Sequence, residues 1–237
     1  MHRKSSRSRL ITGVILTTIT LLCPLHALPF RFLAWDSEIA ARKIGVIDNS
    51  KVSEFQNLDP FRRSGVFNIA GGGAPIFLVA NDRMDAEGKP TTVEIKLAAG
   101  ISAPLVIILP DPSHPTGLRP FVIDDSPRTF AWGSMRFVNA TGKELLFRSD
   151  KSVISLPGTW TPTDFAPGGA TRNMGVKMAA KDNLDDLLYS AVWEHNPDVR
   201  NLVLIIPDTK AQSTKVSLKT IPENRRVAAL DAAAKDP

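Results

Sequence analysis

Two uninterrupted apolar segments of nearly the same sequence stand out in the chain. "PLVIILPD" occupies 104–111 and "NLVLIIPD" occupies 201–208. Each run is short and ends in the turn-forming pair Pro-Asp, so each is expected to be a buried β-strand. A strand that is apolar at every position needs cover on both faces, and a sandwich interior covers one. We expect long loops or a neighbouring domain to cover the other; the alternative is a central strand with half-exposed outer side chains.

Other segments alternate apolar and polar residues with the period of two that is typical of a strand with one buried face. "TTVEIKL" at 91–97 and "KVSLKT" at 215–220 are the clearest cases, and clusters of Gly, Pro, Asn and Asp separate many further short apolar runs. About seven short strands per hundred residues is the pattern of a β-sandwich. The chain is therefore predicted to be all-β with little helix, built as two tandem immunoglobulin-like β-sandwich domains.

The two apolar strands belong to a longer internal repeat with an offset near 97 residues. "FNIAGGGAPIFLVANDR" (67–83) aligns with "FAPGGATRNMGVKMAAKD" (165–182), and "FRFLAW" (30–35) aligns with "MRFVNA" (135–140). We interpret the repeat as an internal duplication; chance similarity is the alternative. The predicted division is a signal peptide at 1–27, a first domain at 28–127, a connector at 128–134, a second domain at 135–222 and a C-terminal tail at 223–237.

One segment leaves its secondary structure open. "DNLDDLLYSAVWEHN" (182–196) has leucines and other apolar residues at helical spacing behind a capping residue. Its partner in the repeat, "EGKPTTVEIKLAAG", is plainly a strand, so we favour a strand over 187–194 and keep a helix over 184–195 as the alternative. "SEIAARK" (37–43) is a second candidate for a short helix, and the Ala-rich end of the chain is expected to be a frayed helix or a tail.

The first residues predict export. Four basic side chains and no acid in the first nine residues precede the apolar run "LITGVILTTITLLCPL", which is too short for a spanning helix. We expect a signal peptide that is cleaved after Ala27, which would leave a periplasmic or secreted protein without a membrane span. An uncleaved membrane anchor is the alternative.

Removal of that segment changes the charge and the cysteine content. The whole chain has 29 Lys and Arg against 24 Asp and Glu; the first 27 residues contain four of the basic residues, so 25 would remain against 24. No basic stripe then remains for nucleic acid, which is excluded as a partner. Cys23 is the only cysteine, so the mature chain would contain none and would be stabilised without disulfides, as fits a bacterial envelope protein.

Motifs for catalysis, metals and cofactors are missing from the sequence. There is no phosphate-binding loop with Lys-Ser/Thr and no G-x-S-x-G turn. After removal of the leader, His114 and His195 are the only histidines, and they lie at different points of the two repeats. We therefore predict no catalytic residue, no metal site and no cofactor.

Tryptophan offers the better candidate for a contact site. Trp160 lies in a loop of Gly, Pro and Thr with few apolar neighbours, so it is expected either to stack on a sugar or anchor a partner, or to fold back onto the sandwich edge. Trp132 lies in the connector and could join the two domains. The candidate ligand or partner contacts are Trp160, Asp164, Glu194 and His195.

The segment "MRFVNATGKEL" (135–145) resembles the opening strand and turn of uncharacterised secreted bacterial tandem β-sandwich repeat proteins of no assigned function. The resemblance implies a tandem sandwich and assigns no residues. We expect an exported, non-enzymatic binding or scaffolding protein of the bacterial cell envelope, whose partner is an envelope protein or a glycan. The alternative is a carbohydrate-binding module or glycan-directed hydrolase that uses loops of the second domain.

Overall fold

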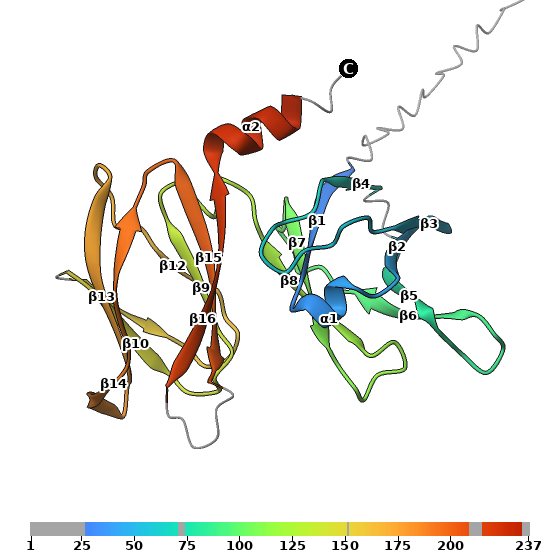
Figure 1. Cartoon of the computed structure of the whole chain (residues 1–237). Coiled ribbons are helices and arrows are strands. Elements are labelled where there is room, and N and C mark those ends of the chain that lie inside the picture. Colours follow the sequence, from blue (N-terminus) through green and yellow to red (C-terminus); the bar gives the residue numbers. More distant parts are fainter. Residues whose placement is uncertain (1–26, 71–73, 151, 209–214, 234–237) are drawn as a thin grey trace, which may run out of the picture.

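Two β-sandwich-like units lie side by side in the computed structural model of the chain (Figure 1). The structure describes residues 27–70, 74–150, 152–208 and 215–233. The predicted signal peptide, except for Ala27, lies outside the described residues. Each unit is made of two four-stranded sheets.

In the part of the chain that the structure describes, the first unit has eight strands and one short helix. One sheet has the strand order β4-β1-β7-β8 and the other has the order β3-β2-β5-β6. Asp36 caps the helix, since its side chain accepts a hydrogen bond of 2.8 Å from the Ile39 N–H. The elements are β1 (Leu28–Ala34), α1 (Ser37–Ala40), β2 (Ile44–Asp48), β3 (Lys51–Glu54), β4 (Phe67–Ile69), β5 (Ile76–Met84), β6 (Pro90–Ile95), β7 (Pro104–Pro110) and β8 (Leu118–Asp124).

The second unit has the same number of strands in the same arrangement. Its sheets have the orders β12-β9-β15-β16 and β11-β10-β13-β14. A helix, α2, follows the last strand directly and includes part of the segment expected to be a frayed helix or tail. The elements are β9 (Met135–Asn139), β10 (Leu145–Ser149), β11 (Ser152–Leu156), β12 (Thr163–Phe165), β13 (Arg172–Ala180), β14 (Asn183–His195), β15 (Val199–Pro207), β16 (Val216–Asn224) and α2 (Arg225–Ala233).

Strand pairing is repeated from one unit to the other. β1 pairs in parallel with β7, and β9 pairs in parallel with β15, while the other strand pairs of both units are antiparallel. Leu33 is opposite Ile107 in the first unit, and Val138 is opposite Leu204 in the second. The predicted all-β fold with two repeated sandwiches and little helix is confirmed.

The segment with two interpretations is a strand. β14 runs over Asn183–His195 and pairs with β13, with a register shift next to Ala179. From Tyr189 to His195 the pairing is regular, and the side chains of Tyr189, Ala191 and Trp193 pack against the core of the second unit. The helical spacing of its leucines was therefore misleading, because tertiary pairing outweighs a weak local preference.

Three apolar cores explain the two fully apolar strands. Val106 and Ile108 of β7 point into the first unit, whereas Leu105, Ile107 and Leu109 point into a separate core between the units. β15 follows the same rule, with Val203 and Ile205 in its own sandwich and Leu202 and Leu204 in the core between the units. The interdomain core consists of Leu33, Leu105, Ile107, Leu109, Ile123, Phe130, Val138, Leu202, Leu204 and Ile221.

The facing sheets of the two units thus bury their outer sides against each other. The expectation that a neighbouring domain covers the second face of these strands is confirmed, since Ile107 and Ile108 are both completely buried. Burial of aliphatic side chains contributes about 1.5 to 3 kcal/mol each, so the nine aliphatic residues of the interdomain core, together with Phe130, make a strong contact between the units.

Replacement of either isoleucine by serine should be severely destabilising. Ile107→Ser leaves a cavity and a buried hydroxyl in the interdomain core, and Ile108→Ser does the same inside the first unit, so each should cost about 3 kcal/mol or more. Thermal or urea unfolding of the two variants measures their loss of stability relative to the parent. Val153→Ser, at an exposed strand position, is the matched control and should be near neutral. A variant at 107 or 108 that melts within a degree or two of the parent would contradict burial of that face.

Candidate functional site

Trp160 lies at the margin of the interdomain core. Its ring centroid is 5.8 Å from that of Trp35 and 5.4 Å from that of Phe121, both in the first unit. The guanidinium of Arg119 lies 5.5 Å above the ring. Of the two expectations for Trp160, the geometry corresponds to folding back, although onto the neighbouring unit and not onto its own sandwich edge. Its side chain is half-buried there.

The other three candidate residues lie apart from Trp160. Asp164 accepts two hydrogen bonds of 2.6 Å from the guanidinium of Arg136, and His195 is buried with Nε2 3.2 Å from the Gly169 carbonyl oxygen. Glu194 is exposed on β14. Within the described part of the chain, no hydrogen bond, ion pair or ring contact joins any two of the four, so they do not form one site.

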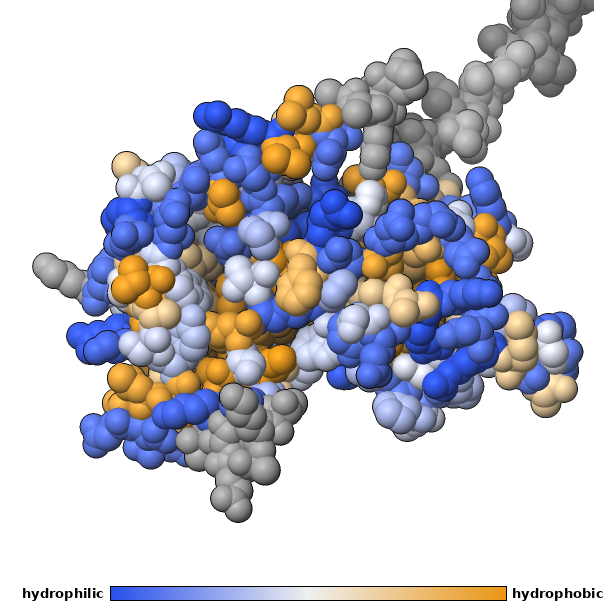
Figure 2. All heavy atoms as spheres, in the orientation of Figure 1, coloured by the Kyte–Doolittle hydropathy of each residue, from blue (hydrophilic) through white to orange (hydrophobic). Residues whose placement is uncertain are grey.

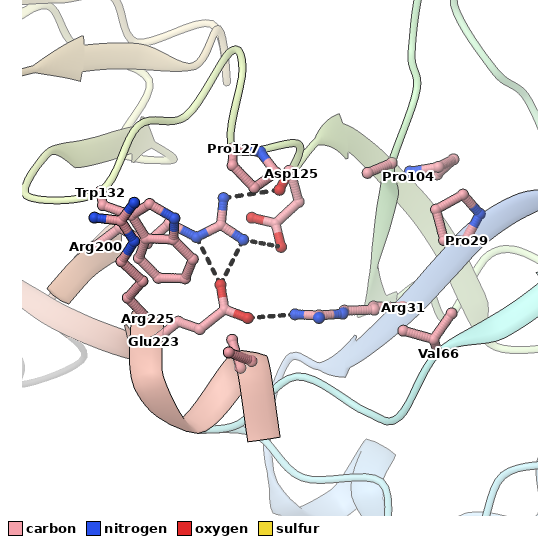
Figure 3. A pocket seen from close by; sticks show the side chains of 13 residues that line it. Pro29, Arg31, Val66, Pro104, Asp125, Pro127, Trp132, Arg200, Glu223 and Arg225 are labelled. Carbon is pink, nitrogen blue, oxygen red and sulfur yellow. Dashed lines mark hydrogen bonds and ion pairs between the residues drawn. The ribbon is translucent and has the colours of Figure 1, made fainter. Parts of the chain in front are cut away.

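A buried network of ion pairs lies at one end of the interdomain contact (Figure 3). Asp125, which directly follows β8, accepts hydrogen bonds of 2.8 and 3.0 Å from Arg63 and one of 3.3 Å from Arg200. Glu223 accepts a hydrogen bond of 2.6 Å from Arg200 Nε and another from Arg31. Arg31 and Arg63 belong to the first unit, whereas Arg200 and Glu223 belong to the second, so the network joins the two units.

The network contains three arginines and two carboxylates, and each carboxylate accepts hydrogen bonds from two of the arginines. Burial would raise the pKa of Glu223, but the positive charges of Arg63, Arg200 and Arg31 outweigh it and lower the pKa below its ordinary value. Arg200 also donates to the Asp125 and Phe130 carbonyls. No buried side-chain nitrogen or oxygen among the described residues lacks a hydrogen-bond partner. Removal of one partner from such a network would leave a buried charge uncompensated.

The guanidinium of Arg200 also lies against two aromatic rings. Its guanidinium lies 4.8 Å from the centroid of Trp132 and 5.0 Å from that of Phe130, both in the segment between the two units. Trp132 therefore contacts the second unit through a cation–π interaction. Phe130 is completely buried in the interdomain core. The connector thus packs into the contact between the units.

A pocket of about 380 Å³ opens beside the network. Figure 3 shows Pro29, Pro104 and Val66 on one side, with Trp132, Arg200 and Glu223 on the other. The walls are mainly apolar, and the buried charges beside them are already bound to one another. The pocket therefore has the position of a ligand site at a domain junction, while its charged residues are explained by the contact between the units.

The sequence contains a weak signal for this network. Arg31 is the one charged residue in "FRFLAW", and Arg136 holds the same place in "MRFVNA". Arg31 is opposite Leu105 and Arg136 is opposite Leu202, two leucines that are themselves equivalent in the repeat. A charged residue conserved between two copies of an apolar strand indicates a buried ion pair, but the partners Asp125 and Glu223 lie too far away in the chain to be assigned.

Comparison with known proteins identifies no family for the chain. No family model matches the chain, and no curated protein matches it. Among solved structures, a candidate cell adhesion protein from Bacteroides uniformis ATCC 8492 has 12% sequence identity with this chain. The match covers 84% of this chain and 98% of that protein, with a TM-score of 0.23. A TM-score this low carries no argument about function.

The described residues contain no group of three or more His, Cys, Asp or Glu side chains arranged to hold a metal ion. They also contain no helix that is both long enough and apolar enough to cross a membrane.

Lys219 forms a second polar contact between the units. Its ammonium group, on β16, donates to the Ala34 and Trp35 carbonyls at the end of β1. It lies 5.8 Å from the Trp35 ring centroid and 5.4 Å from that of Phe61. Burial lowers the pKa of Lys219 to about 8, although Asp36 and Asp59 act in the opposite direction.

The depressed pKa of Lys219 predicts a stability that rises with pH. Between about pH 8 and pH 10.5 the unfolded chain keeps the Lys219 proton while the folded protein has lost it. The unfolded state then binds more protons, so the free energy of unfolding increases with pH across this window. Urea unfolding of the parent and of Lys219→Met at several pH values measures this contribution, because the other titrating groups cancel in the difference. The parent should gain stability relative to the variant as pH rises; parallel profiles would contradict it.

Proposed function

We propose that the chain is an exported, non-enzymatic binding or scaffolding protein of the bacterial cell envelope. The observation that supports this most directly is the contact between the two sandwiches, where an apolar core and a buried ion network join them. Relative motion of neighbouring domains is the usual expectation unless their contact is large and hydrophobic. Here the two units are expected to move as one body, which suits a protein that holds binding surfaces at a fixed spacing.

The use of the polar residues also supports a role in binding or scaffolding. Asp125, Glu223 and Asp164 are held in ion pairs with arginine, and His195 lies against a backbone carbonyl. Glycoside hydrolysis requires two carboxyl groups that face each other across a sugar. The candidates Asp164 and Glu194 lie on different sheets, one paired with Arg136 and one exposed. The glycan-directed alternative therefore has less support.

Export is proposed from the first 27 residues, whose basic start, short apolar run and Ala27 match a secretory signal. Residue 28 is the first residue of β1, so cleavage after Ala27 would leave every strand of both units intact. The mature chain would be free of cysteine.

Intact mass and ligand stabilisation together test the proposal. Protein recovered from the periplasm or the medium should have the mass of residues 28–237 within a few residues at the start, and retention of residues 1–27 would contradict cleavage. A thermal shift against cell-wall and plant glycans tests the alternative, because a ligand at 100 times its dissociation constant adds about 2.7 kcal/mol to stability. We expect no shift with any glycan. A clear shift that Trp160→Ala abolishes would favour the carbohydrate-binding function instead.

A further inference from the structure

Among the described residues, seven of the eight strands at the edges of the sheets carry features that disfavour pairing with another chain. Natural proteins protect such edges with short strands, proline and charge. β6, β8 and β16 contain Pro90, Pro120 and Pro222, and the other four are three to five residues long. These four are β3 (Lys51–Glu54), β4 (Phe67–Ile69), β11 (Ser152–Leu156) and β12 (Thr163–Phe165).

β14 is the exception. It has 13 residues and contains no proline, lysine or arginine. Its first part is protected by Asp185 and Asp186, by the register shift and by Lys215, whose ammonium group donates to the Leu187 carbonyl. The segment "LYSAVW" at 188–193 is uncharged. From Tyr189 to His195, β14 pairs regularly with β13, and no strand of the described part of the chain pairs with its other side. An uncharged, regular strand at a sheet edge is a template for a further strand.

The first unit provides an internal control for this difference. Its equivalent strand, β6, has six residues, begins with Pro90 and contacts β8 of the facing sheet. β14 has no comparable contact with β16 among the described residues. The two units therefore differ at the same sheet edge. The edge is protected by proline and by contact with β8 in the first unit, and it lacks both features at β14 in the described part of the second.

Val192 marks the centre of the open edge. Its side chain is 70% exposed, and its neighbour in register on β13 is Gly175, which offers it no side chain. Figure 2 shows apolar surface at the lower left of the second unit, where Figure 1 places the start of the same strand. A large apolar side chain with no side chain directly opposite it on its own sheet lacks the cross-strand contact that stabilises a sheet.

We propose that β14 pairs antiparallel with β14 of a second copy of this chain, on a two-fold axis at Val192. The axis places Val192 opposite Val192, so that each covers the other. It also places Ala191 opposite Trp193, a small side chain against a large one, and Ser190 opposite Glu194, whose carboxylate accepts from the hydroxyl. No like charges face each other, and each contact occurs twice, as the symmetry of such an interface requires. The two four-stranded sheets become one sheet of eight strands.

The size and state of the protein in solution test the pairing. The parent should show a concentration-dependent equilibrium between monomer and dimer in analytical ultracentrifugation. Val192→Lys places two positive charges opposite each other and should weaken the dimer by about tenfold or more, while the melting temperature of the monomer changes little because the position is exposed. Val153→Lys makes the same change on the opposite edge of the same sheet and should leave the dimer intact.

The register has its own test. Ser190→Lys places a positive charge opposite Glu194 of the second copy and should leave the dimer as tight as in the parent or tighter. In a Cys23→Ser background, Val192→Cys should form a disulfide-linked dimer on oxidation, whereas Val153→Cys should not. A parent that remains monomeric up to high micromolar concentration would overturn the proposal, and so would a dimer that tolerates Val192→Lys.

Discussion

The structure depends on the burial of two sheet faces against each other. β7 and β15 are apolar on both sides, so neither sandwich could expose its inner-facing sheet to water without leaving a large apolar surface. The interdomain core removes that surface from both units at once. The segment between the units, with Phe130 buried and Trp132 against Arg200, is packed into the same contact.

The polar contacts at this junction follow from the apolar one. Charged side chains that are withdrawn from water at the end of an apolar contact need hydrogen-bond partners within the protein. Here they pair with one another, in a network of Asp125, Glu223, Arg63, Arg200 and Arg31. Duplication explains part of the arrangement. Arg31 and Arg136 are equivalent, yet Arg31 reaches Glu223 in the other unit while Arg136 binds Asp164 in its own. The two copies keep an arginine at the same strand position, half-buried at Arg31 and buried at Arg136, and they differ in the acid that pairs with it.

Local pattern was enough to predict the fold. Period-two alternation, turn residues and the repeat at 97 residues predicted two sandwiches, and the unbroken apolar runs predicted cover on both faces of β7 and β15. The network was harder to predict, because residues that pair in it lie as far as 192 positions apart in the chain, as Arg31 and Glu223 do. Trp160 lies in a polar loop, but its apolar neighbours Trp35 and Phe121 belong to the other unit, which no local pattern reveals.

Differential scanning calorimetry of the chain from Leu28 onwards tests most directly whether the two sandwiches are one body. If the interdomain core couples them as described, both units should unfold in a single cooperative transition whose calorimetric and van't Hoff enthalpies agree. Two separable transitions, or a van't Hoff enthalpy near half of the calorimetric one, would contradict the account.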